Sequence, residues 1–169
     1  APASDFEYYP LSDGTVKITK YKGTAENVVI PSTIYGSDVT GIEFAFLRNK
    51  TVKSVVIPNT VKEIGTQAFD ECSELTSVSI PNSVVKIRRM AFNECTKLQS
   101  VTIPDSVLSL SDHVFYGCTS LATINGGNNL ELIENGALSN TLWERNLPDG
   151  IVYFGKVAYD YRGSMPENA

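Results

Sequence analysis

Residues 55–123 decide the fold, because they contain three consecutive copies of one sequence repeat. The copies are VVIPNTVKEIGTQAFDECSELTS from Val55, VSIPNSVVKIRRMAFNECTKLQS from Val78 and VTIPDSVLSLSDHVFYGCTSLAT from Val101, so each copy begins 23 residues after the one before. A short fixed period predicts a solenoid, because one such unit cannot bury its own apolar face and stacked units bury it together.

Columns of equivalent residues predict the core, as the recurring Phe69, Phe92 and Phe115 illustrate. In L-x-x-V-x-I the apolar residues alternate and are mostly β-branched, which predicts a short strand. The proline that follows lacks an N–H for a sheet ladder and marks the strand's end. The V-x-x-I segment is expected to follow a change in chain direction and is compatible with a second, shorter strand. A-F-x-x-C-x-x-L is compatible with one helical or 3-10 turn.

Residues 1–27 do not fit the repeat and predict an N-terminal cap. Two β-prone runs flank Asp13-Gly14, a pair that favours a hairpin turn. We expect this hairpin to cover the first coil, which would otherwise expose core and strand edge. Residues 28–123 hold the repeats, and in the irregular first copy the inserted segment IYGSD is expected to form a loop on the outside of the coil.

Residues 124–169 predict a degenerate repeat and a C-terminal cap. Leu130, Ile133, Ala137 and Leu138 keep the period, but Gly126-Gly127 replaces the strand-ending Ile-Pro and predicts a turn. Two β-prone runs around Gly155 predict a second hairpin-like cap, and the tail at 164–169 is expected to fray. The prediction is a single solenoid domain over 1–169.

Composition excludes several classes of partner. The chain has 169 residues, 42% hydrophobic and 20% charged, and a formal net charge of −5. An acidic chain lacks the basic surface that nucleic acid or an anionic membrane requires, so we expect no nucleic-acid partner. No apolar run approaches the roughly 18 residues that a membrane-spanning helix needs, so we expect no membrane insertion.

The pattern L-x-x-V-x-I-P-x-[ST]-V-x-x-I-x-x-x-A-F-x-x-C resembles the BspA-like leucine-rich repeat of bacterial surface proteins. The match is direct over residues 28–138, and I-P, A-F and C are in register in two full copies, whereas the third has Val114-Phe115 in place of A-F. The flanks SDGTVKITKYKG and W…PDGIVYFGKVAYDYRG also resemble the end segments of that family.

The resemblance implies an α/β leucine-rich-repeat solenoid of parallel strands, curved and exported to the cell surface. Together with the period it predicts about five coils with short helical or 3-10 turns, capped at both ends by β-hairpin-like segments. It also implies adhesion or protein recognition, and it offers no catalytic residue to carry over. We therefore expect no enzyme activity and no cofactor.

The three cysteines, Cys72, Cys95 and Cys118, occupy one column, and we interpret them as buried thiols that act as small hydrophobes. Stacked coils would place them about 4.8 Å apart, which is inside the range that a disulfide accepts, so spacing alone does not exclude a bond. A zinc site is not expected without a CxxC or Cys/His pairing. His113, the only histidine, is interpreted as a surface side chain.

Two pairs of carboxylates are candidate acid/base groups: Asp70-Glu71, and Glu131 with Glu134. Catalysis would require each pair to face a common pocket. Repeat loops more often carry solvated charge, and that is the interpretation adopted for both pairs.

The remaining candidate site is the outward side of the L-x-x-V-x-I strands. Solenoids bind through such extended faces. The candidate ligand-binding positions are Lys53, Ser54, Val56, Thr76, Ser77, Ser79, Gln99, Ser100, Thr102, Thr123 and Asn125. They are polar, rich in hydroxyls and nearly uncharged, whereas the aromatic residues typical of protein hot spots lie in the two caps.

Two functions stay open. The first is a secreted or surface-displayed module, expected to be monomeric, that binds an extracellular protein or glycan through this face. The second is a structural spacer or stalk that presents another domain. The face itself could also be no more than a solvated sheet surface.

Overall fold

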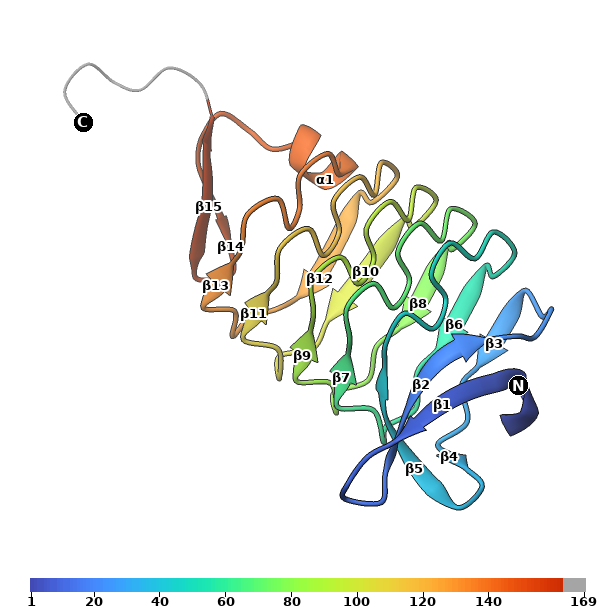
Figure 1. Cartoon of the computed structure of the whole chain (residues 1–169). Helices are drawn as coiled ribbons and strands as arrows, with labels where there is room; N and C mark the ends of the chain where they lie inside the picture. Colours follow the sequence, from blue (N-terminus) through green and yellow to red (C-terminus); the bar gives the residue numbers. More distant parts are fainter. Residues whose placement is uncertain (163–169) are drawn as a thin grey trace.

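The computed structural model describes residues 1–162, the last three by their backbone alone, so the fraying expected at 164–169 lies outside the described residues. The predicted solenoid is confirmed: the chain winds through about five coils, each adding a strand to two parallel arrays (Figure 1). Hairpins stand at both ends of the stack, as predicted.

The first array, here called the ladder sheet, is built from the L-x-x-V-x-I segments. Its strands are β3 (Asn27–Val29), β6 (Ser54–Val56), β8 (Ser77–Ser79), β10 (Ser100–Ile103) and β12 (Thr123–Gly126). All pairings within it are parallel, β3 with β6, β6 with β8, and β10 with β12. The backbone N–H of Gln99 donates to the carbonyl of Thr76 at 3.5 Å, which places β10 beside β8.

The second array, the corner sheet, includes the V-x-x-I segments and so confirms the second strand. Its order is β1 (Phe6–Pro10), β2 (Val16–Tyr21), β5 (Ser37–Ile42), β7 (Glu63–Ile64), β9 (Lys86–Ile87), β11 (Ser109–Leu110) and β13 (Leu132–Ile133). The inserted IYGSD segment forms a hairpin, because β4 (Thr33–Ile34) pairs antiparallel with β5.

The A-F-x-x-C segments are successive hydrogen-bonded turns with little helix, as when Cys72 N donates to the carbonyl of Phe69, three residues back, at 3.2 Å. Gln67 and Glu71 have left-handed backbone angles, with φ of 52° and 56°. Phe69 N donates to the carbonyl of Ala91 at 2.8 Å, and Glu71 N donates to that of Asn93 at 2.8 Å. A helix would commit these N–H groups to its own carbonyls, whereas here they bind the next coil. We call this row of bonds the turn ladder.

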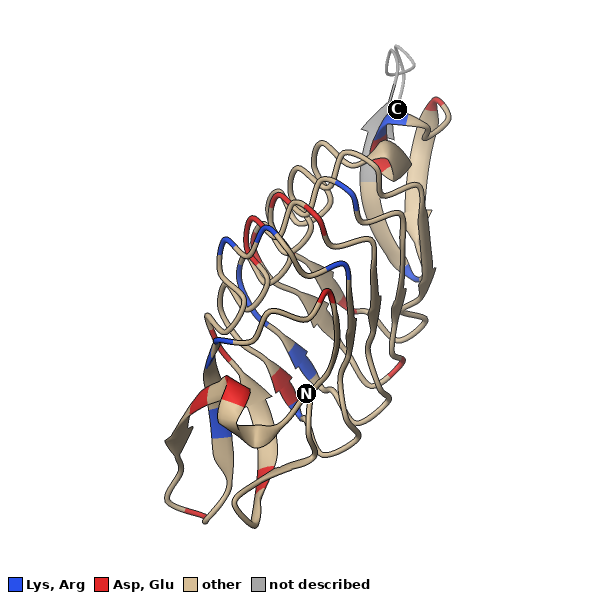
Figure 2. Ribbon diagram, turned by 90° about the vertical axis from the view of Figure 1, so that its right-hand side faces the viewer, with Lys and Arg blue, Asp and Glu red and all other residues tan. Residues whose placement is uncertain are grey.

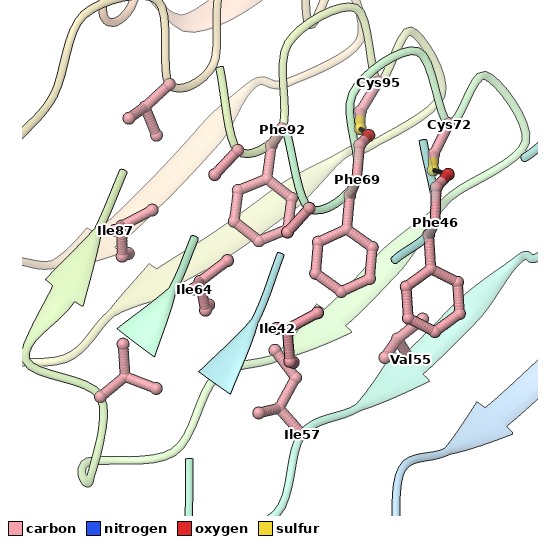
Figure 3. Packing of buried hydrophobic residues seen from close by; sticks show 14 of the residues in the cluster. Ile42, Phe46, Val55, Ile57, Ile64, Phe69, Cys72, Ile87, Phe92 and Cys95 are labelled. Carbon is pink, nitrogen blue, oxygen red and sulfur yellow. Dashed lines mark hydrogen bonds between the residues drawn. The ribbon is translucent and has the colours of Figure 1, made fainter. Parts of the chain in front are cut away.

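Aromatic rings fill the interior in a continuous stack. Phe46, Phe69, Phe92 and Phe115 are all buried. Their ring centroids are 4.9, 5.1 and 5.3 Å apart in succession, and the rings lie within 15° of parallel. Figure 3 shows three of these rings, those of Phe46, Phe69 and Phe92. Tyr21 of β2 stacks on Phe46 at 5.1 Å, so the N-terminal hairpin continues the column rather than merely covering it.

The C-terminal cap begins with a short helix, α1 (Leu142–Arg145), and ends with the hairpin of β14 (Gly150–Phe154) and β15 (Val157–Arg162). The Trp143 ring lies edge-on to Phe154 at 5.4 Å and to Tyr159 at 5.5 Å. These rings pack against the last coil, where no further repeat phenylalanine follows Phe115. At the other end, the 3-10 helix η1 (Ala3–Asp5) precedes β1.

Candidate functional site

The structure brings the predicted positions onto one surface, the ladder face. They form three columns along the solenoid axis, because the strands pair in register, Ser54 with Ser77 and Val56 with Ser79. The same holds at the far end, where Ser100 pairs with Thr123. All of the predicted side chains are exposed except that of Ser54, which is half-buried. The columns are Lys53, Thr76 and Gln99; Ser54, Ser77, Ser100 and Thr123; and Val56, Ser79, Thr102 and Asn125.

Two further members of the face were missed in the sequence. Asn27 pairs with Ser54 and Val29 pairs with Val56, so β3 extends the columns by one coil. The signal was present, since the VVIP of the first copy aligns with the VVIP at Val55. The prediction nevertheless began the face at Lys53.

The two halves of the ladder face differ in chemistry. In the β3–β6 half, polar groups bind one another: Ser54 Oγ donates to Asn27 Oδ1 at 2.6 Å, and Lys53 Nζ lies 2.7 Å from Glu26 Oε2. The hydrogen bond to Glu26 raises the pKa of Lys53. Val29 and Val56 add an aliphatic patch, being 58% and 45% exposed.

In the β8–β12 half, most side chains lack internal partners, and the exception is Thr76, whose Oγ1 donates to the carbonyl of Lys53 at 2.9 Å. Within residues 1–162, no hydrogen bond engages the side chains of Ser79, Gln99, Ser100, Thr102 and Asn125. Donors and acceptors on neighbouring strands are therefore available to a ligand without first breaking a protein contact. This half is the more favourable part of the face for specific polar recognition.

The cysteine column is structural. Cys72, Cys95 and Cys118 are free and buried, as predicted. Cys72 Sγ donates to the carbonyl of Phe46 at 2.9 Å and Cys95 Sγ to that of Phe69 at 3.1 Å (Figure 3). Burial raises the pKa of Cys72 to about 12 and that of Cys95 well above its ordinary value, so neither is a nucleophile at neutral pH.

Asp70 corrects one prediction, because it is a buried carboxylate and not a solvated loop charge. It is 4% exposed, and it accepts hydrogen bonds from Gln67 Nε2 at 2.6 Å and from Asn93 Nδ2 at 2.7 Å. Asn93 comes from the following coil. Asp70 therefore ties two coils together and does not face a pocket with Glu71, which instead binds Arg48 Nε at 3.1 Å.

His113 is half-buried and held by its neighbours. Its Nδ1 lies 2.6 Å from Asp112 Oδ1, and its ring packs against Tyr116 at 5.0 Å. Asp112 also pairs with Arg89 Nε at 3.0 Å, and the hydrogen bond to His113 is the main cause that lowers the pKa of Asp112. Of the other two candidate carboxylates, Glu134 joins this group, because it accepts the Asp112 backbone N–H at 2.8 Å, and both Glu131 and Glu134 are exposed.

Within residues 1–162, no cluster of three His, Cys, Asp or Glu side chains is arranged to hold a metal ion. A helix long and apolar enough to cross a membrane is likewise absent from these residues. Charged residues alternate in sign along the stacked turns, where Figure 2 shows blue and red segments side by side, and most pair with the adjacent coil.

Comparison with known proteins decides the family. The BspA type leucine rich repeat region matches residues 40–165 in six copies, which is more than half of the chain. The chain belongs to the BspA-type leucine-rich-repeat family. The resemblance read from I-P, A-F and C is thus confirmed. No curated protein matches the chain.

Solved structures of bacterial leucine-rich-repeat proteins share this fold. A leucine rich repeat protein of T. pallidum is 32% identical, with a TM-score of 0.77 over 82% of this chain and 66% of that one. A leucine rich cell surface protein of Faecalibacterium prausnitzii is 30% identical, with a TM-score of 0.60 over 81% of this chain and 45% of that one.

The pneumococcal vaccine antigen PcpA is 24% identical, with a TM-score of 0.62 over 76% of this chain and 34% of that one, and shows the fold alone. This BspA-type chain spans less than two thirds of the length of each of these three proteins.

Proposed function

We propose that this chain is a non-catalytic interaction module, displayed on or secreted from a bacterial cell, that binds an extracellular protein or glycan through its ladder face. The observation that carries the proposal is the free half of that face. Ser79, Gln99, Thr102 and Asn125 present unpaired polar groups on adjacent strands that are held in register by the core. Rigid strands position such groups more accurately than loops can.

The repeat itself supports a binding role. Interior positions recur from coil to coil, whereas the ladder face changes from aliphatic at Val29 and Val56 to hydroxyl and amide toward Asn125. A sheet face whose only role was to contact solvent would not require this change from aliphatic to polar side chains along its length. The similarity to the cell surface protein of Faecalibacterium prausnitzii supports the proposed location.

Binding to panels of extracellular matrix proteins and to glycan arrays tests the proposal. The test variant carries Thr76→Trp, Gln99→Trp and Thr102→Trp, which fill the face with bulk while leaving the buried columns untouched. We expect it to lose at least about tenfold in affinity for any ligand that the unmodified chain selects, a change equivalent to about 1.4 kcal/mol.

A matched control carries Lys62→Trp and Lys86→Trp, two exposed positions at the corner sheet, one directly before β7 and one in β9. Binding that survives in the ladder variant and falls in the control would move the site to the corner sheet. Circular dichroism melting of both variants checks that the solenoid is intact.

The second candidate is a spacer that presents another domain. Ion pairs between consecutive coils favour it, since Arg48–Glu71 and Glu74–Lys97 bridge neighbouring turns and stiffen the stack. A spacer predicts that no panel member binds the unmodified chain and that the tryptophan variants behave alike.

A further inference from the structure

The N-terminal end of the turn ladder lacks a neighbour. Along that ladder, the carbonyls of Asp70, Asn93, Tyr116 and Ser139 each accept an N–H from the preceding coil, at 2.7 to 3.0 Å. Leu47 is the first member of this column. Within residues 1–162, no donor reaches its carbonyl oxygen.

The cause lies in how the N-terminal hairpin joins the first coil. Tyr21 N donates to the carbonyl of Ala45 at 2.7 Å. This bond is equivalent to the one that Phe46 N makes to the carbonyl of Ala68, so Tyr21 supplies the first bond of the turn ladder. The chain then runs directly to β3 and builds no A-F-x-x-C turn. The row of stacked turns in Figure 1 therefore starts with the coil that contains Leu47.

A groove of about 570 Å³ occupies the place of the missing turn. That volume is within the range of about 300–1,000 Å³ that is typical of ligand sites. Its wall includes Phe44 and Leu47, which are 44% and 38% exposed. Its floor is the buried column that begins with Tyr21 and Phe46.

The groove is basic, although the protein is acidic. Lys20, Arg48 and Lys50 line it, and no carboxylate does. Carboxylates outside the lining offset these cations only in part: Lys20 Nζ lies 4.0 Å from Glu7, and Arg48 Nε lies 3.1 Å from Glu71. Lys50 Nζ donates to a backbone carbonyl, that of Glu71, at 2.6 Å and so keeps its charge unpaired.

We propose that this groove binds an acidic peptide segment of a partner protein, which adds one turn to the start of the turn ladder. A backbone N–H of the peptide donates to the Leu47 carbonyl, as the turns of this chain donate to one another. An apolar side chain packs on Phe44 and Leu47, and flanking carboxylates pair with Lys20, Arg48 and Lys50. This is recognition by extension of a hydrogen-bonded edge, with side chains supplying selectivity.

The unpaired carbonyl and the apolar wall favour a peptide over a sulfated glycan. Both would match the three cations, but a glycan brings no aliphatic or aromatic side chain to Phe44 and Leu47. The groove shares no lining residue with the ladder face, so this inference goes beyond the proposed function and does not depend on it.

Fluorescence anisotropy with a short labelled peptide tests the inference. The probe has a central phenylalanine flanked by glutamates. Its controls are the same peptide with lysines in place of glutamates and one with an N-methylated backbone around the phenylalanine. We expect the acidic peptide to bind, and the lysine and N-methylated peptides to bind roughly tenfold more weakly or not at all.

The protein variant Lys20→Glu with Lys50→Glu is expected to weaken the acidic peptide by about tenfold or more, because contacts between charged groups are the strong ones in such sites. The control, Lys62→Glu with Lys86→Glu, has the same net charge on the corner sheet and should bind as the unmodified chain does. The tryptophan variant of the ladder face should also bind normally.

Three results would overturn the inference: no binding of the acidic peptide at millimolar concentration, equal loss in the two charge-reversed variants, or binding of a heparin fragment in the groove with none of the peptide. Because the two control peptides are compared on the unmodified chain, they decide the matter even if a charge-reversed variant proves unstable.

Discussion

The three regular coils over 55–123 and the two coils that flank them solve the same packing problem with different residues. One column shows this best. In the regular coils it holds cysteines, each of which donates its thiol to a phenylalanine carbonyl in the preceding coil. In the first coil the column holds Asn49, and in the fifth it holds Thr141.

Asn49 and Thr141 both bind their own coil. Asn49 Oδ1 accepts from the backbone N–H groups of Thr51 and Val52, each at 2.9 Å. Thr141 Oγ1 donates to the carbonyl of Leu138 and accepts from Glu144 N at 3.0 Å, which makes it the N-cap of α1. A thiol thus continues the stack, and a residue that caps locally ends it.

A second difference lies at the end of the ladder strand. Gly126 takes the place of Ile103, the residue before the strand-ending proline, and has φ of 73°. A Cβ there would lie 2.2 Å from the carbonyl oxygen of Ile103, so only glycine fits. The backbone conformation at the end of the ladder strand therefore departs from the repeat in the fifth coil. The turn of this coil, in contrast, keeps the ladder bond from Phe115 N to the carbonyl of Ala137 at 2.8 Å.

The strongest way to break the regular coils is to interrupt the phenylalanine stack. Phe92→Ala should lower the free energy of unfolding by about 3–5 kcal/mol, because it leaves a cavity between Phe69 and Phe115. Urea unfolding measures the change. Val56→Ala on the ladder face is the control and should cost no more than about 0.5 kcal/mol. Equal stability of the two variants would show that the stack does not hold the coils.

The thiol column predicts a loss of stability in alkali. Cys72 has a folded pKa of about 12 against an ordinary value of 9.0, because burial disfavours its thiolate. Its stabilising contribution is thus complete below pH 9.0 and is lost as the pH rises toward 12. At about pH 10.5 the loss from this thiol is about 2 kcal/mol.

Urea unfolding at a series of pH values, with Cys72→Ala beside the unmodified chain, isolates this contribution from that of other groups. The alkaline slope should be shallower in the variant. Identical slopes would mean that the Cys72 thiol is not buried in the folded protein.

The local cap at the end of the stack should contribute less to the free energy of unfolding than the phenylalanine stack and the buried thiol do. Thr141→Val keeps the shape of a buried side chain but removes the N-cap of α1, at a cost of about 1 kcal/mol. Thr123→Val on the ladder face is the matched control and should be nearly neutral. Thermal melting compares the two. A neutral Thr141→Val would indicate that α1 contributes nothing to closing the last coil.

Ion pairs between coils should matter least. Lys97 Nζ lies 2.7 Å from Glu74 Oε2, and both side chains are partly exposed to solvent. A double-mutant cycle with Lys97→Gln and Glu74→Gln should give a coupling energy of about 0–1 kcal/mol, smaller still in high salt. A coupling well above that range would make charge, and not the interior columns, the main tie between coils.

The interior could be predicted from the sequence, because each column repeats its residue type and burial follows from that repetition. The turn ladder could not. Gln67 and Met90 are good helix formers, yet they adopt φ of 52° and 57°, since the bonds that their turns make to the next coil outweigh local preference. Asp70 was misjudged for the same reason, because Asn93, which binds it, comes from the following coil.

The outward side chains of β6 to β12 could be predicted, since alternation along a strand determines which side chains point outward. That they bind a ligand stays a prediction. The contrast in the ladder face between an internally bonded half and a free half was not predictable. That contrast depends on the hydrogen bond between the particular side chains of Ser54 and Asn27, which the period alone does not determine.

Hydrogen–deuterium exchange followed by mass spectrometry of the unmodified chain most directly tests the claim that the regular coils hold the molecule and the flanking coils close it. Peptides from residues 55–123 should retain deuterium protection longest, and those from 1–27 and 124–162 should exchange first, because end units of a stack open at lower cost. Protection that is greatest in the two hairpin caps, with earlier exchange in the coils of Phe69 and Phe92, would contradict the account.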